Sequence, residues 1–418
     1  MERLHLEFDA LPGPQCVVFR VKPTAISVTF DVYSVYTFEH TGRLHAAFED
    51  GIHYRRGLDN RVLARRGADA RPGAGPENGM MVPEASDALI ERVRRRVVAA
   101  WEALEAGDAR MQVCEPEGAR EQASEWFGRI SAWVPEALER DRERFGEVYT
   151  PIGILPPDQY MSLVVQATEG CPWNGCTFCD FYHDRPFRVR DPDDLATHIA
   201  VVKDFVGEGI RLRRSIFLGD ANALTVPWPR LEQTFGMVRK AFGNGGGGPD
   251  GSRIYGFTDA FGATHRSPSE IESLSGWGLQ RVYIGLETGH DPLLELVGKQ
   301  GASQDAVDAV RRLRAGGIEI GAIVLLGLGG DRFSDAHVRD TTRVLNQMGL
   351  RAGDMIYFSE MVAPPELEYA GQMAEIGVRP LTSDEMKAQM SAIREGLVFP
   401  NPEQRPRMAI YDIRRFVY

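Results

Sequence analysis

The nine residues CPWNGCTFC, from Cys171 to Cys179, are the most informative stretch of this sequence, because they contain three of its five cysteines. Cys171, Cys176 and Cys179 form a C-x4-C-x2-C array. Thiolates are soft ligands that bind zinc or iron–sulfur clusters. A closed zinc site needs four protein ligands, and His183 is the one histidine close to this array. Three thiolates suit a four-iron cluster with one open iron, so we predict a reactive cluster, with structural zinc as the alternative.

From about residue 161 to residue 359, on both sides of the cysteines, short apolar segments typical of strands alternate with amphipathic segments typical of helices. Strands are predicted at 161–167, 215–220, 253–259, 281–287, 318–327 and 354–359, and helices at 191–207, 229–242, 268–276, 302–315 and 334–348. This alternation indicates consecutive βαβ units and a parallel sheet, either open and doubly wound or closed into a partial barrel. The cysteines directly follow the first strand, and active sites of parallel α/β folds lie at the carboxyl ends of strands.

The first 150 residues do not show this alternation of single strands and helices. Strands rich in β-branched and aromatic residues are predicted within 15–50, a Gly- and Pro-rich loop at 67–84, and helices at about 86–106 and 118–145. A glycine-rich run at 243–251 predicts a surface loop. We predict three parts: an N-terminal α+β region at 1–150 that covers the substrate, a barrel at 151–365, and a helical C-terminal extension at 366–418.

The overall composition is that of a globular protein, with 43% apolar and 26% charged residues. The net charge of −11 disfavours a general attraction to nucleic acid or to anionic membranes. No stretch approaches about 18 uninterrupted apolar residues, so no membrane span is expected. The N-terminus lacks an apolar signal core, and five cysteines with three clustered do not form a disulfide framework. These features predict a cytoplasmic protein in a reducing environment.

These motifs, in this order, resemble the radical S-adenosylmethionine (SAM) superfamily over about residues 155–365. The resemblance is strongest to the branch of Elp3, the methylthiotransferases and the oxygen-independent coproporphyrinogen oxidases. The first cysteine gap is one residue longer here than the C-x3-C-x2-C spacing usual in the superfamily. The resemblance implies a partial (βα)6 barrel of the TIM type, with Cys171, Cys176 and Cys179 as ligands of three irons of a [4Fe–4S] cluster. The fourth iron would bind the amino and carboxylate groups of SAM.

The same resemblance implies roles in SAM binding for residues near the first two strands. Phe178, just before the last cysteine, would pack near the adenine. Gly219 and Asp220 stand where the family usually has G-G-E and would meet the methionyl amino group of SAM. A carboxylate such as that of Asp220 can accept hydrogen bonds from this group. A turn or helix-cap role is the alternative for Asp220.

Residues at the ends of the fourth and fifth strands complete the implied SAM site. Glu287 would bind the ribose or carboxylate region of SAM, with a buried structural acid as the alternative. Lys299 would face the SAM carboxylate, although a lone lysine is more often a solvated surface residue. Leu326 and Gly327 lie at the glycine-rich end of the fifth strand, where close backbone approach would let main-chain groups contact adenine.

The sequence therefore predicts an oxygen-sensitive radical SAM enzyme that abstracts hydrogen from a small-molecule substrate and receives electrons from a flavodoxin or ferredoxin. One alternative is a radical SAM enzyme that modifies a peptide or tRNA. A basic face on the N-terminal region would favour that alternative, and its candidate residues are Arg55, Arg56, Arg61, Arg65 and Arg66. The other alternative is a non-catalytic interaction protein that binds zinc or an iron–sulfur cluster.

Overall fold

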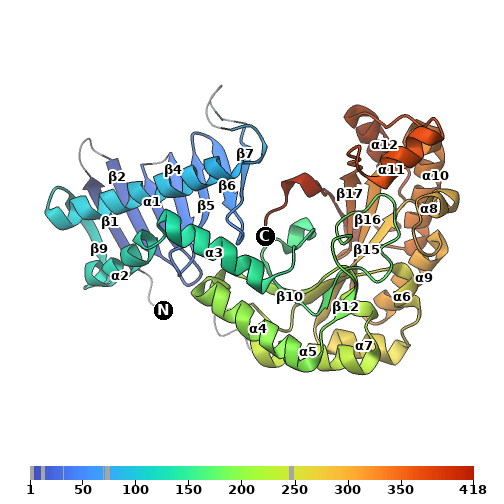
Figure 1. Ribbon diagram of the computed structural model, residues 1–418, viewed down its shortest axis with the longest axis horizontal. Coiled ribbons are helices and arrows are strands. Elements are labelled where there is room, and N and C mark those ends of the chain that lie inside the picture. Colours follow the sequence, from blue (N-terminus) through green and yellow to red (C-terminus); the bar gives the residue numbers. More distant parts are fainter. Residues whose placement is uncertain (1–3, 11–14, 32, 69, 71–75, 244–248) are drawn as a thin grey trace.

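The computed structural model describes residues 4–10, 15–31, 33–68, 70, 76–243 and 249–418. Figure 1 shows two parts side by side, an N-terminal sheet covered by helices on one face and a curved parallel sheet surrounded by helices. The loops predicted at 67–84 and 243–251 both include residues outside the described part of the chain. None of the helices in the described part has the length and apolar character needed to cross a bilayer.

The N-terminal sheet is an antiparallel meander with spatial order β8-β7-β6-β5-β4-β3-β2-β1-β9. Its strands are β1 (Leu4–Ala10), β2 (Gln15–Val21), β3 (Ile26–Phe30), β4 (Ser34–Phe38), β5 (Leu44–Glu49), β6 (Ile52–Arg56), β7 (Val62–Arg66), β8 (Gly79–Met80) and β9 (Arg110–Glu115). Every second residue of β3 and β4 is buried, as expected for a sheet with one covered face. That face packs on α1 (Pro83–Ala106) and α2 (Ala119–Ser131) in one apolar core.

The helix predicted at 118–145 is two helices, α2 and α3 (Pro135–Val148), so the single-helix prediction is wrong. Pro135 occupies the first turn of α3, and Val134 before it is extended, with ψ 164°. A residue that precedes proline is sterically pushed out of the helical region. The chain therefore breaks after α2 and turns before α3 begins.

The second part is a partial barrel of seven parallel strands in the order β10-β13-β14-β15-β16-β17-β18, within the described residues. Its strands are β10 (Ser162–Gln166), β13 (Ser215–Gly219), β14 (Ile254–Thr258), β15 (Leu279–Glu287), β16 (Glu319–Leu326), β17 (Met355–Glu360) and β18 (Arg407–Ile410). The six predicted strands are present. The seventh, β18, was not predicted because its four residues, RMAI, are too short to show a pattern, and it pairs with the distant β17.

Helices connect the strands and cover the outside of the barrel (Figure 1). They are α4 (Pro192–Val206), α5 (Trp228–Phe242), α6 (Ala260–Thr264), α7 (Pro268–Gly276), α8 (Asp291–Leu296), α9 (Ser303–Ala315), α10 (Gly330–Met348), α11 (Glu368–Glu375) and α12 (Ser383–Glu395). Strands β10, β13 and β14 are buried on both faces, as in other parallel sheets. Strand β18 lies within 366–418, so this segment contributes a strand as well as helices.

The amino ends of the barrel strands are closed from inside by Asp158, in the short helix η1 (Pro157–Gln159). The hydroxyls of Tyr283 and Tyr357 each donate a hydrogen bond of 2.6 Å to its carboxylate. Arg281 forms an ion pair with the same carboxylate at 2.7 Å. The interior is therefore filled at this end, and space remains at the carboxyl ends of the strands.

The two parts meet through a buried group of charges. Glu39, after β4, is 1% exposed and pairs with Arg43 at 3.3 Å and with Arg213, just before β13, at 3.7 Å. Arg43 also pairs with Asp141 of α3. Burial opposes the charge of Glu39, but the two guanidinium groups hold the pKa of this carboxyl below its usual value. The N-terminal part is thus fixed to the barrel by paired charges.

Candidate active site

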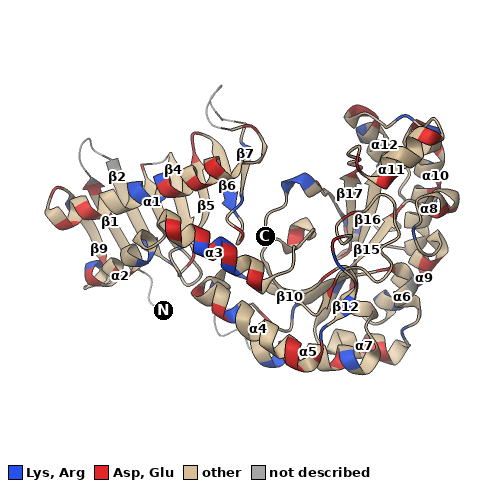
Figure 2. Cartoon of the chain, in the orientation of Figure 1, with Lys and Arg blue, Asp and Glu red and all other residues tan. Residues whose placement is uncertain are grey.

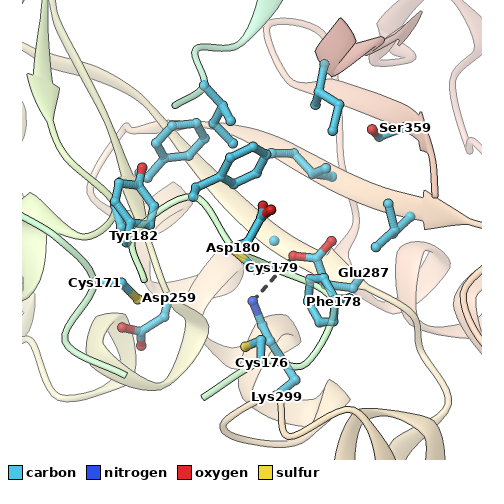
Figure 3. A pocket seen from close by; sticks show the side chains of 18 of the residues that line it. Cys171, Cys176, Phe178, Cys179, Asp180, Tyr182, Asp259, Glu287, Lys299 and Ser359 are labelled. Atoms are coloured by element: carbon cyan, nitrogen blue, oxygen red, sulfur yellow. Dashed lines mark hydrogen bonds and ion pairs between the residues drawn. The ribbon is translucent and has the colours of Figure 1, made fainter. Parts of the chain in front are cut away.

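A cavity of about 350 Å³ opens at the carboxyl ends of the barrel strands. It receives residues from the loop after β10 and from the ends of β13 to β17, as well as from the segment after β18. Figure 3 shows several of the predicted site residues pointing toward one another around it. The predicted residues that line the cavity are Cys171, Cys176, Phe178, Cys179, Glu287 and Lys299.

The cysteine loop is held by the segment that follows α8. The indole N–H of Trp173 donates to the carbonyl of Gly298 at 2.7 Å, and the amide of Thr177 donates to the carbonyl of Val297 at 3.0 Å. Gly298 has φ +67°, and a Cβ at this position would lie 2.5 Å from the carbonyl oxygen of Gly175. Only glycine allows this close approach without strain. The loop therefore has a defined conformation before any ligand binds.

The three thiols are free and partly buried. Burial raises the pKa of Cys176 to about 11 and that of Cys179 to about 12. Among the described residues, no three His, Cys, Asp or Glu side chains are gathered closely enough to hold one metal ion. A four-iron cluster takes one thiolate on each of three irons when the fourth iron is left open. The three thiols line the same cavity, as the ligands of such a cluster would.

Glu287 and Lys299 form an ion pair at 3.3 Å on the wall beside Cys176. Glu287 ends β15 with φ +58°, next to a shift in the pairing of β15 with β16. Such an irregularity re-aims a side chain at the end of a strand. A Cβ on Gly285 would collide with the Glu287 carboxylate and lie 3.1 Å from the Lys299 ammonium. The Glu287–Lys299 pair thus occupies space that is free because Gly285 has no side chain.

Lys299 is charged in this setting. Burial opposes its charge, but the carboxylate of Glu287 and the sulfur of Cys176 raise the pKa of Lys299 above its usual value. This lysine is therefore a fixed cation at the cavity wall and not a solvated surface residue. Phe178 adds an apolar wall to the same cavity and packs on a small apolar cluster that includes Leu293 and Leu325.

Asp220 and Gly219 are not among the residues that line the cavity. The Asp220 carboxylate accepts from the side chain of Gln166 at 2.9 Å and from the amide of Gly170 at 3.1 Å, and it lies 3.6 Å from Arg185. Burial raises the pKa of Asp220 to about 6. In this conformation Asp220 anchors the start of the cysteine loop, and its contact with SAM stays a prediction.

Leu326 and Gly327 also lie outside the cavity lining, while Ile323 and Leu325 line it. Successive side chains of a strand point to opposite faces, so Leu325 faces the cavity and its neighbour Leu326 does not. The amide of Gly327 donates to the side chain of Gln389 in α12 at 2.8 Å. The predicted adenine contacts of Leu326 and Gly327 therefore stay untested.

Several cavity residues were missed by the sequence analysis. Asp259 follows β14 and caps α6, and its amide donates to Asn222 at 3.0 Å. Its position at the end of the strand predicted at 253–259 was an available signal. Ser359 is the last residue but one of β17, and Tyr411 comes from the segment after β18. Tyr411 could not be found from sequence, because no local pattern tells that this distant segment reaches the cavity.

The arrangement is that of a parallel α/β barrel with a three-thiol site at the carboxyl ends of its strands. Residues 165–345 match the model of the family described as "Radical SAM superfamily". These residues therefore form a domain of the radical SAM type. No curated protein matches the chain.

The solved structures that match include several radical SAM enzymes. TsrM, a methyltransferase from Kitasatospora setae, is 17% identical over 53% of this chain and 41% of its own, with TM-score 0.39. The cobalamin-dependent enzyme OxsB is 15% identical over 56% and 31%, with TM-score 0.38. Coproporphyrinogen III oxidase from Escherichia coli is 11% identical over 56% and 52%, with TM-score 0.42. The TsrM structure contains a [4Fe–4S] cluster, and the OxsB structure contains SAM.

The chain spans between about a third and about a half of the length of these three proteins.

Proposed function

We propose that this protein binds a [4Fe–4S] cluster through Cys171, Cys176 and Cys179 and uses SAM to abstract a hydrogen atom from a small-molecule substrate. The observation that carries this proposal is the convergence of three free thiols on one cavity at the carboxyl ends of the strands of a radical SAM domain. The cluster would supply the electron that cleaves SAM to methionine and a 5′-deoxyadenosyl radical.

The other side chains of the cavity have complementary tasks in this proposal. The Lys299 ammonium would pair with the SAM carboxylate, and Glu287 would accept hydrogen bonds from ribose hydroxyls. Phe178 would give the adenine an apolar surface. Asp259, after β14, and Ser359, near the end of β17, also line the cavity and offer polar groups that could orient a substrate. The closed amino end of the barrel would keep water from entering the cavity through that end.

A small molecule is the proposed substrate, because the cavity has about 350 Å³ and a mostly apolar wall with a few polar groups. All five cysteines are free thiols, which supports a reducing cytoplasmic setting. Electrons would come from a flavodoxin or ferredoxin.

The proposal is tested by anaerobic reconstitution with iron and sulfide, followed by iron analysis and electron paramagnetic resonance (EPR) of the dithionite-reduced protein. We expect about four irons per chain and an EPR signal that SAM changes, because one iron is left open to it. Cys176→Ala should lose the cluster. Cys114→Ala is the matched control, because Cys114 is an exposed thiol outside the cavity.

Two results would contradict the proposal. One is a full cluster in Cys176→Ala, which would mean that these cysteines are not its ligands. The other is a four-iron cluster whose EPR signal is insensitive to SAM, which would favour the non-catalytic iron–sulfur protein.

A further inference from the structure

A second cleft, of about 780 Å³, lies between the N-terminal sheet and the barrel. Its floor consists of residues of β4 to β7, and its opposite wall consists of residues around η1 and after β18. None of the residues that line it lines the cavity of the cysteines. It is therefore a separate site.

The floor of the cleft is set by the register of four neighbouring strands. One row across the sheet runs through Val35, Phe48, His53 and Arg65. The adjacent row runs through Thr37, Ala46, Arg55 and Leu63. Because side chains opposite each other in a sheet share a face, both rows present their side chains to the cleft. The His53 ring packs on the Phe48 ring with centroids 4.7 Å apart.

The cleft carries an excess of positive charge. Three guanidinium groups line it, those of Arg55, Arg65 and Arg415, against the single carboxylate of Asp412. Figure 2 shows basic stretches on the ends of β6 and β7 and on the C-terminal segment that faces them. In a chain of net charge −11 this concentration of arginine is a local exception.

Two of the three arginines have no carboxylate partner within the part of the chain that the structure describes. Arg55 donates to the carbonyl of Tyr160 at 2.5 Å and lies 5.1 Å from the centroid of its ring. Burial, and after it the nearby Arg213, lowers the pKa of Arg55 to about 10. Arg415 pairs with Asp412 at 3.1 Å. Cations that lack counter-ions inside a cleft are suited to bind an anion.

The cleft and the catalytic cavity share one thin wall. Within the segment after β18, Tyr411 and Ile413 line the catalytic cavity, whereas Ile410 and Asp412 line the cleft. Alternate residues of one extended segment thus face the two sites. Ile410 is 64% exposed and offers an apolar contact beside the arginines. An occupant of the cleft would touch the same segment that closes the catalytic cavity.

We propose that this cleft binds the oxyanion group, a carboxylate or a phosphate, of a small ligand through Arg55, Arg65 and Arg415. The arginines do not extend into a continuous basic face. Arg56 is buried and paired with Asp141, and Arg61 pairs with Asp59. A long polyanion needs a stripe of cations along its path, so a discrete anion fits this site better than a nucleic acid.

The test is isothermal titration calorimetry of the full chain with two probes, inorganic pyrophosphate and citrate, at low ionic strength. We expect at least one of them to bind with about one molecule per chain, and the one that binds tells whether the site prefers phosphate or carboxylate. The double variant Arg65→Gln and Arg415→Gln should weaken binding at least about tenfold, because charge-assisted hydrogen bonds are lost. Both side chains are exposed, so the fold should be retained.

The matched control is Arg95→Gln on α1, whose side chain is 75% exposed and lies outside the cleft. It should change the affinity by less than about twofold, because distant surface charges are screened. Binding of neither probe would overturn the proposal. Equal weakening by the control and by the double variant would also overturn it, because it would indicate attraction to the surface charge in general.

Discussion

The Glu287–Lys299 pair gives the sharpest prediction about the cavity. Glu287→Gln removes the negative charge but keeps the size of the side chain, so the Lys299 ammonium loses its carboxylate partner. Breaking a buried ion pair costs about 3–5 kcal/mol, because one charge remains buried and uncompensated. The Lys299 side chain is 21% exposed and that of Glu287 is 12% exposed. Water therefore partly screens the unpaired ammonium, and we expect a cost at the lower end of this range, about 3 kcal/mol.

The assay is thermal unfolding of the chain before addition of iron and sulfide, followed by circular dichroism. In a domain of roughly 150–250 residues, each kcal/mol of lost stability lowers Tm by about 2–4 °C. A loss of about 3 kcal/mol should therefore lower Tm by roughly 6–12 °C. The double variant Glu287→Gln with Lys299→Met should recover most of that loss, since the unpaired ammonium is gone. A decrease of less than about 2 °C in the single variant, or no recovery in the double variant, would refute the pairing.

Three further predictions concern the surroundings of the site. Gly298→Ala should lower the iron bound after reconstitution while the helix content is retained, because its Cβ would push on the cysteine loop at Gly175. The control Gly371→Ala, which meets no atom within 4 Å, should bind iron like the wild type. Asp220 has its pKa raised from 3.8 to about 6 by burial, so the folded state holds this proton more tightly than the unfolded state. Stability from this group is therefore lost as the pH rises from about 4 to about 6, by about 3 kcal/mol. In Asp220→Asn that loss should disappear when Tm is compared at pH 4.5 and pH 7. Glu39→Gln should lower Tm through loss of a fully buried carboxylate with two arginine partners, at a cost of about 3–5 kcal/mol. An unchanged Tm in Glu39→Gln would show that this group does not join the two parts.

Most of the barrel could be predicted from local pattern. The six predicted strands are apolar runs separated by five predicted amphipathic helices, and these signals are independent of distant contacts. Strand β18 could not be predicted, because its four residues become a strand only by pairing with β17. The break between α2 and α3 carried a local signal in Pro135, which the helical spacing of the aromatic residues around it concealed.

The site was predictable where its residues sit in one motif or at a strand end. The three cysteines and Phe178 come from one loop, and Glu287 ends a strand that was predicted correctly. On the fifth strand, Leu325 lines the cavity and its neighbour Leu326 does not. The predicted main-chain contact of Leu326 and Gly327 with adenine stays a prediction. The position of Tyr411 in the cavity depends on how the C-terminal segment folds back onto the barrel, and composition and spacing do not reveal this.

The central claim is that this chain cleaves SAM at the three-cysteine cavity. The most direct measurement is the formation of 5′-deoxyadenosine by the anaerobically reconstituted protein with dithionite and SAM, quantified by chromatography. The account predicts formation by the wild type and by the control Cys114→Ala, and none by Cys176→Ala. Equal formation by Cys176→Ala, or none by a wild type whose cluster is complete and binds SAM, would contradict it.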